Sequence, residues 1–247
     1  MAPADQGDAP QRRILMCTDE SELGELARQW AGRCARELGV ALVTLHGNPA
    51  TPAATLIPAH PADLLVLGLA DSQGWVPHTA VDLVAAAPCL TVLMRPNGGY
   101  PQKPVTAAVS GDPSDEAVLA AAVDLAAICH TEVRLLHTHP LPLRHSDSPE
   151  ERWAGQAVLE SVLRQLLRLT PDYTPSTELV RLQAQEAVGH HCGDGLLVVG
   201  ARRTPHPGLG TVTRTALHHA RSPVAVARTH LASERKRTQE SRVSSLS

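Results

Sequence analysis

A stretch late in the chain combines the residue types that proteins use to bind phosphate. A run with the composition of a buried strand ends at Gly200, and a helix is expected to start further on, at Gly210, Thr211, Val212 and Thr213. Glycine lets the backbone approach a phosphate closely, and a helix N-terminus supplies N–H donors and a positive dipole. The stretch therefore predicts an anion site, and its alternative is a helix cap without a ligand.

Thirteen histidines raise the question of a metal site. His137 and His139 would share a face of one strand, and His190, His191 and Cys192 form a run. No carboxylate or thiol recurs at a matching ligand spacing, so we expect solvent-exposed histidines at strand ends and in loops, and no metal. No nucleophile stands at a recognisable spacing from a base, so the sequence does not predict a catalytic triad.

A repeated pattern of strands and helices must position these loops. The first copy opens with a strand at Arg13, continues with an amphipathic helix that ends at Gly39, and has further strands at 40–46, 62–68 and 90–94, with residues 50–60 as a short helix or loop. The second copy has strands from Val105 and at 132–139, 177–182, 195–200 and 223–227. It also has a helix from Pro149 to Leu169, capped by Ser148 and Glu151, that the first copy lacks.

Alternating strands and helices predict an α/β fold in which parallel strands form open sheets covered on both faces. We expect two tandem Rossmann-like domains, of which the first is truncated. The predicted boundaries are a flexible tail at 1–12, a first domain at 13–98, a linker at 99–103, a second domain at 104–229 and a flexible tail at 230–247.

Composition excludes several classes of function. A net charge of −3 and 2% aromatic residues disfavour nucleic-acid binding. Five widely spaced cysteines in mostly apolar runs fit reduced thiols better than a disulfide framework. The polar first residues do not form a signal peptide, and the apolar runs are too short to span a membrane. We therefore expect a cytoplasmic protein.

The segment after Gly200 resembles the universal stress protein family. ATP-binding members carry Gly, two residues, Gly, nine residues, Gly and then Ser or Thr after the fourth strand. Gly200 matches the first glycine and Gly210 with Thr211 the last pair, whereas Arg203 replaces the middle glycine in a shortened loop. Arg203 would either pair with a phosphate or obstruct it.

The resemblance covers residues 13 to 228 and divides the family's site between the copies. Asp19 and Ser21 stand where the family has an acid and a serine beside the nucleotide, and Ser110 replaces that acid in the second copy. Thr138 matches the position whose backbone meets adenine in nucleotide-binding relatives.

In the first copy, Pro77 and His78 replace the Gly-Thr pair, and proline has no N–H to donate. We therefore expect the first copy to be empty.

The resemblance implies a stress-response or regulatory protein, without expected catalysis. It would bind ATP or AMP, with or without Mg²⁺, in the second copy, through Ser110, Thr138, Gly200, Arg203, Gly210, Thr211, Val212 and Thr213. Since family members commonly pair through their last strands, LTVLM and PVAVA are expected to pair as an internal pseudo-dimer, and a homodimer of the chain is a further expectation. The sequence names no protein partner.

Two alternatives stay open. The first is a scaffold or protein-interaction module that binds no nucleotide. The second is an adenylating enzyme, because the loop at Ser110 resembles the Ser-Gly-Gly phosphate loop of ATP-dependent ligases, although Asp112 replaces the second glycine.

Overall fold

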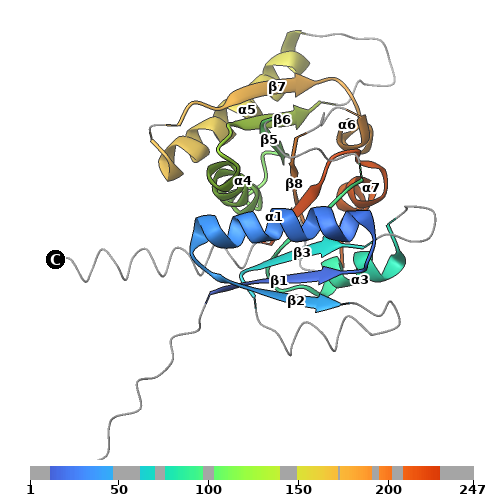
Figure 1. Cartoon of the computed structure of the whole chain (residues 1–247). Helices are drawn as coiled ribbons and strands as arrows, with labels where there is room; N and C mark the ends of the chain where they lie inside the picture. Colours follow the sequence, from blue (N-terminus) through green and yellow to red (C-terminus); the bar gives the residue numbers. More distant parts are fainter. Residues whose placement is uncertain are drawn as a thin grey trace, which may run out of the picture.

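A single β-sheet forms the centre of the computed structural model (Figure 1), which describes residues 12–46, 62–69, 76–96, 103–139, 149–171, 173–190, 195–201 and 208–228. Within these residues the sheet has nine strands in the order β2-β1-β3-β4-β9-β8-β5-β6-β7. The strands are β1 (Arg13–Thr18), β2 (Ala41–His46), β3 (Leu64–Gly68), β4 (Leu90–Leu93), β5 (Val105–Val109), β6 (Val133–Thr138), β7 (Ser176–Val180), β8 (Leu197–Gly200) and β9 (Val224–Ala227).

One antiparallel junction joins two parallel half-sheets. Strands β1 to β4 are parallel to one another, and so are β5 to β9. Strands β4 and β9 run antiparallel, with Val92 opposite Ala225. The expected pairing of the last strand of each copy is therefore present, and the predicted α/β class is confirmed. The two predicted domains share one sheet, and their boundaries stay a prediction.

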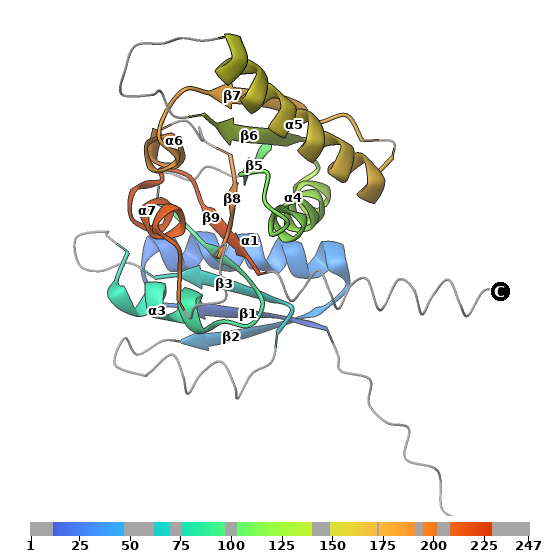
Figure 2. The same cartoon turned by 180° about the vertical axis from the view of Figure 1, so that it is seen from behind.

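Helices cover both faces of the sheet, as Figures 1 and 2 show from opposite sides. The helices are α1 (Glu22–Leu38), α3 (His78–Ala86), α4 (Asp115–Cys129), α5 (Pro149–Leu169), α6 (Ala184–His190) and α7 (Thr211–His219). One core cluster packs α1, α4 and α5 against one face, and a second packs α3, α6 and α7 against the other. The sequence did not predict α6. Among the residues of this short helix whose burial is described, the buried ones are the consecutive Ala187, Val188 and Gly189, which give no helical repeat.

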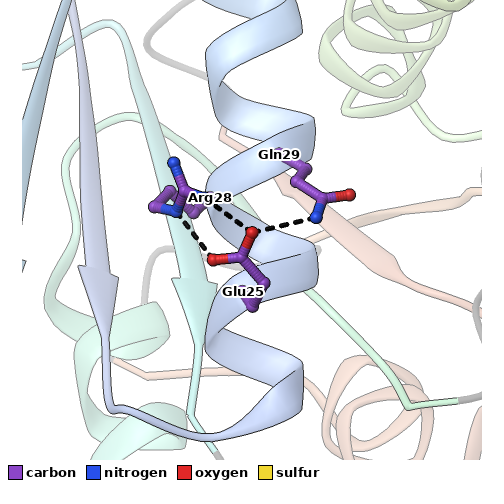
Figure 3. A network of polar contacts seen from close by, with 3 residues as sticks. All are labelled: Glu25, Arg28 and Gln29. Atoms are coloured by element: carbon purple, nitrogen blue, oxygen red, sulfur yellow. Dashed lines mark hydrogen bonds and ion pairs between the residues drawn. The ribbon is translucent and has the colours of Figure 1, made fainter.

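The N-terminus of α1 is held by its own side chains. The hydroxyl of Ser21 accepts the N–H of Gly24, 3.1 Å away. On the exposed face, Glu25 accepts hydrogen bonds from Arg28 (2.6 and 2.8 Å) and from Gln29 (2.9 Å), as Figure 3 shows. These bonds lower the pKa of Glu25 to about 2. Because water screens such a network, it contributes little to stability.

The extra helix and strand of the second half change how well the sheet is covered. Strands β2 and β6 hold matching places, beside β1 and β5 respectively. Val133 and Leu135 of β6 are fully buried on the face that α5 covers, whereas Leu42 of β2, which packs against the same core cluster, is only half-buried. The truncation predicted for the first copy therefore leaves its outer strand less covered among the described residues.

Two arginines cross the junction between the half-sheets in matching ways. Arg95, just after β4, is 7% exposed and donates hydrogen bonds to the carbonyl oxygens of Ala216 (3.3 Å) and Leu217 in α7. Arg228, just after β9, donates to the carbonyl oxygens of Val84 (2.7 Å) and Ala85 in α3. Burial lowers the pKa of Arg95 to about 10, so the side chain stays charged at neutral pH. Each half thus binds the C-terminal turn of a helix of the other.

Several sequence predictions fall outside the described residues. These are both tails, the linker at 99–102, the segment 50–60 and the cap at Ser148. Helix α5 begins at Pro149, as predicted. No described helix has the length and apolar character needed to cross a bilayer.

Helix α4 ends at a residue in an unfavourable backbone conformation. His130 has φ 51° and ψ 47°, whereas the matching position after α1 is Gly39, with φ 63°. A side chain at positive φ is strained, and glycine is not. His130 also lies 3.5 Å from the carboxylate of Glu37, but both side chains are largely exposed, so this ion pair contributes little.

We predict that Arg95→Ala lowers the free energy of unfolding by about 2 to 3 kcal/mol, because it removes charged donors and buried packing. Urea unfolding followed by circular dichroism measures the change. Arg214→Ala, which truncates an exposed arginine of α7, is the control and should change it by less than about 0.5 kcal/mol. Equal effects of the two variants would mean that strand pairing alone holds the halves together.

We predict that His130→Gly raises the free energy of unfolding by about 0.5 to 1 kcal/mol, whereas Gly39→Ala lowers it by about 1 kcal/mol. Both residues end a helix in the same left-handed conformation, so the two substitutions should change the free energy of unfolding in opposite directions for the same reason. Urea titration of both variants measures the two changes. A loss of stability in His130→Gly would show that the ion pair with Glu37 outweighs the backbone strain.

Candidate functional site

Three of the predicted site residues lie at the carboxyl ends of neighbouring strands. Strand β5 lies between β8 and β6, and its pairing sets Val109 opposite His137 and Ala107 opposite Val198. Continuing this register puts Ser110 beside Thr138 on one side and next to the end of β8, at Gly200, on the other. Carboxyl ends of parallel strands are where open α/β sheets bind ligands.

Helix α7 starts beside these strand ends with free backbone donors. Its N-cap is Gly210, in an extended conformation with φ −68° and ψ 163°, and no side chain caps the helix. The first intrahelical bond runs from the N–H of Arg214 to the carbonyl of Gly210, 2.9 Å away. The amides of Thr211, Val212 and Thr213 therefore have no acceptor within the helix. The N-cap is a glycine, which has no side chain, and Thr211 is already the first helical residue, so the threonine of the helix-cap alternative does not stand at the N-cap position.

Two other polar groups of this turn are used internally. The hydroxyl of Thr213, a residue that is 2% exposed, donates to the carbonyl of Gly200 at 2.6 Å. The N–H of Gly210 donates to the carbonyl of Ala201 at 2.8 Å. These bonds fix the start of α7 against the end of β8. The polar groups left facing outward are the backbone amides of the first turn and the exposed hydroxyl of Thr211.

The loop after β5 is organised by an acid that the sequence analysis did not single out. The carboxylate of Asp115 accepts the N–H of Ser110 (2.9 Å), the N–H of Gly111 (2.7 Å) and the hydroxyl of Ser110 (3.2 Å). Asp115 is 4% exposed, and burial raises its pKa while these hydrogen bonds oppose the rise. A signal was present in the sequence, since an acid in the first turn of a helix can reach back to the preceding loop.

The end of β6 differs from expectation at one histidine. His137 was expected to be exposed, but it is 8% exposed, and its Nδ1 lies 2.9 Å from the carbonyl oxygen of Val109. The buried position follows from β7 and α5, which cover this part of β6. Thr138, the next residue, is half-buried at the strand end.

The remaining predicted residue, Arg203, lies outside the described residues, as do His191 and Cys192. In the described part of the chain, no three His, Cys, Asp or Glu side chains are grouped so that they could hold a metal ion. Cys17, Cys34 and Cys89 are buried free thiols, and burial raises their pKa values to about 11, 12 and 11. Thiols with such pKa values are poor nucleophiles.

The first half uses its matching acid differently. Asp19 follows β1 and accepts the N–H of Ser21 at 3.1 Å and also the Ser21 hydroxyl. At the start of α3, Pro77 is the N-cap, with no side-chain cap. In the second half the matching N–H, that of Gly210, is already bonded to Ala201, so the missing N–H of Pro77 does not by itself distinguish the two halves as ligand sites.

The fold is that of the universal stress proteins. A Pseudomonas aeruginosa protein described as a universal stress protein matches with a TM-score of 0.63 and 16% identity, over 91% of this chain and 98% of its own. A universal stress protein from Archaeoglobus fulgidus matches with a TM-score of 0.61 and 11% identity, over 90% of this chain and 100% of its own. No family model and no curated protein matches the sequence.

Shorter universal stress proteins match about half of this chain. One, from Archaeoglobus fulgidus, was solved in complex with dAMP and matches 50% of this chain with a TM-score of 0.41 and 21% identity. The dAMP belongs to that protein.

We predict that Thr213→Val lowers the free energy of unfolding by about 1 kcal/mol, because the buried carbonyl of Gly200 loses its hydroxyl donor while the side-chain volume is kept. Thermal or urea unfolding measures the loss. Thr211→Val, at the exposed first position of the same helix, should change stability by less than about 0.5 kcal/mol. Equal stabilities of the two variants would show that the hydrogen bond between Thr213 and Gly200 makes no net contribution to the free energy of unfolding.

Proposed function

We propose that this chain is a tandem universal stress protein with a regulatory or stress-response role, and that its second half binds ATP or AMP. The observation that carries the proposal is the start of α7, where three backbone amides without intrahelical acceptors lie next to the carboxyl ends of β8 and β5. Such an arrangement favours a phosphate group through hydrogen bonds and the helix dipole together.

The phosphates would bind to the amides of Thr211, Val212 and Thr213. The adenine would lie toward Thr138, one strand beyond Ser110 in the sheet. Gly200 would let the ligand approach the end of β8, and Arg203 would pair with a phosphate from the loop before α7. Mg²⁺ would be bound by the phosphates and would neutralise part of their charge, since the described residues offer no cluster of ligands for it.

We expect slow or no hydrolysis. Of the nearby acids, Asp115 is occupied by the amides of Ser110 and Gly111, and Asp112 accepts the N–H of Ser114 at 3.0 Å. A general base must be within reach of the water it activates, and an acid that already accepts from its own loop is a weak candidate. A sensor whose state follows nucleotide binding fits this arrangement better than an enzyme.

The scaffold alternative is favoured by a different observation. Fewer side-chain donors are free than the sequence motif suggests, because the hydroxyls of Thr213 and Ser110 are both committed to internal acceptors. If the amides of α7 bind no phosphate, the nine-stranded sheet serves as a rigid body that presents its surface and tails to protein partners. The adenylation alternative loses support, because the donors of its loop, at Ser110 and Gly111, are already occupied by Asp115.

We predict that millimolar ATP or AMP raises the unfolding temperature of the purified chain, with or without magnesium. A ligand present at a hundredfold excess over its dissociation constant adds about 2.7 kcal/mol to the stability of the native state. Thermal unfolding followed by fluorescence detects such a shift. Absence of a shift at any nucleotide concentration would favour the scaffold.

The site is tested by Thr211→Pro, which we predict to remove most of the shift and to leave the unfolding temperature without nucleotide nearly unchanged. Proline is well tolerated at the first position of a helix, and Gly210 before it already has the extended conformation that proline requires. The variant therefore deletes one free amide at little structural cost.

The matched control is His78→Pro, the same change at the first position of α3. It should leave the nucleotide shift intact, because the first half is expected to be empty. A shift abolished by His78→Pro but kept in Thr211→Pro would place the nucleotide in the wrong half for this proposal.

A further inference from the structure

The loop after β5 has the shape of a phosphate-binding loop, but its backbone N–H donors are already bonded to a carboxylate of the same chain. Its backbone donors, the N–H groups of Ser110 and Gly111, both point at one oxygen of Asp115 at 2.9 and 2.7 Å. The hydroxyl proton of Ser110 goes to the other oxygen at 3.2 Å. An internal carboxylate thus occupies the place that an external anion would need.

Two further groups of this loop offer hydrogen-bond acceptors. The lone pairs of the Ser110 hydroxyl are acceptors, and the second acid, Asp112, adds a negative charge nearby. A phosphate offers only acceptors at neutral pH and would meet the charges of Asp112 and Asp115, whereas the hydroxyls and amino group of adenosine are donors. Donor-rich ligand groups therefore suit this loop, and anions do not.

The two halves place carboxylates differently at the end of their first strand. In the first half, Asp19 in the loop binds Ser21 at the helix start. Gly24 occupies the place in α1 that Asp115 occupies in α4, counted back from the left-handed residue that ends each helix. A Cβ at Gly24 would come within 2.2 Å of the Asp19 carbonyl oxygen, so α1 has no room for a side chain there. The second half also has a loop acid, Asp112, which accepts the N–H of Ser114 at the helix start, and it adds the helix carboxylate of Asp115.

We propose that Asp115 is the positioning residue of the second-half site, and that it fixes which way round the nucleotide binds. By holding the amides of Ser110 and Gly111, it reserves the β5 end of the site for the sugar and base. The phosphates are left to α7, where the amides of the first turn lack intrahelical acceptors. This inference rests on the proposed nucleotide site and deepens it.

Calorimetric titration of the full chain with ATP, adenosine and inorganic pyrophosphate tests the proposal. In Asp115→Ala, the N–H groups of Ser110 and Gly111 lose their carboxylate acceptor, so the loop should lose its set position. We expect the affinities for adenosine and ATP to fall roughly tenfold and the affinity for pyrophosphate to change less than about twofold. An unfolded or generally weakened variant would lose all three ligands together. A loss of adenosine binding with unchanged pyrophosphate binding therefore distinguishes a positioning role of Asp115 from a general structural role.

The control is Glu116→Gln, which removes one negative charge from the same first turn of α4 and leaves the loop bonds in place. It should leave all three affinities within about twofold of the wild type, since a charge effect alone is screened at the half-exposed Glu116. Unchanged adenosine binding in Asp115→Ala would overturn the proposal. So would equal losses of adenosine and pyrophosphate, or an equal effect of Glu116→Gln.

Amide hydrogen exchange separates this inference from the proposed function. Exchange at Ser110 and Gly111 should speed up at least tenfold in Asp115→Ala and not in Glu116→Gln, whether or not a nucleotide is present. If wild type binds none of the three ligands while exchange responds as expected, the proposed nucleotide function fails, and the ligand orientation fails with it. If the ligands bind but exchange does not respond, the role of Asp115 is overturned and the nucleotide site stands.

Discussion

The antiparallel pairing of β4 with β9 is the contact on which the rest of the structure depends. It turns two parallel half-sheets, each with an open edge, into one sheet of nine described strands. Buried Arg95 and its counterpart Arg228 each cross this junction to the carbonyl oxygens that end a helix of the other half. A buried guanidinium is favourable only where such acceptors are held in place, so the strand pairing and the arginine contacts require each other.

The junction also separates the two places where a ligand could bind. Because the half-sheets run antiparallel where they meet, the carboxyl ends of β1 and β3 lie at the opposite end of the strands from those of β5 and β8. One half can therefore lose its site without disturbing the other. Among its described residues the first half has no counterpart of α5 and β7, and its β2 is less buried than β6. Sharing a sheet lets this smaller half keep a packed core, because its inner edge is closed by β9.

The second half combines two kinds of polar group that suit different parts of one ligand. The amides at the start of α7 favour negative charge, and the loop around Asp115 disfavours it. These opposite preferences lie at neighbouring strand ends, so a nucleotide bound as proposed would place its phosphates and its nucleoside in different surroundings. The bond from Thr213 to Gly200 holds the start of α7 against β8, and that of Asp115 holds the loop against β5. The site is therefore set by internal hydrogen bonds that exist before any ligand arrives.

The sequence alone determined the order of the described strands, the extra helix from Pro149 and the glycine before α7, but not helix α6, because hydrophobic periodicity and helix-start signals are local properties of the chain. It also predicted the pairing of the last strands, through the family resemblance. Tertiary structure alone decided that Arg95 would meet α7, that His137 would be buried and that the hydroxyl of Thr213 would turn inward to Gly200. Each of these depends on which segments lie side by side in space. Even Asp115, only one helical turn from its loop, has its role because packing of α4 against the sheet removes water from its carboxylate, and burial is a property of the folded chain.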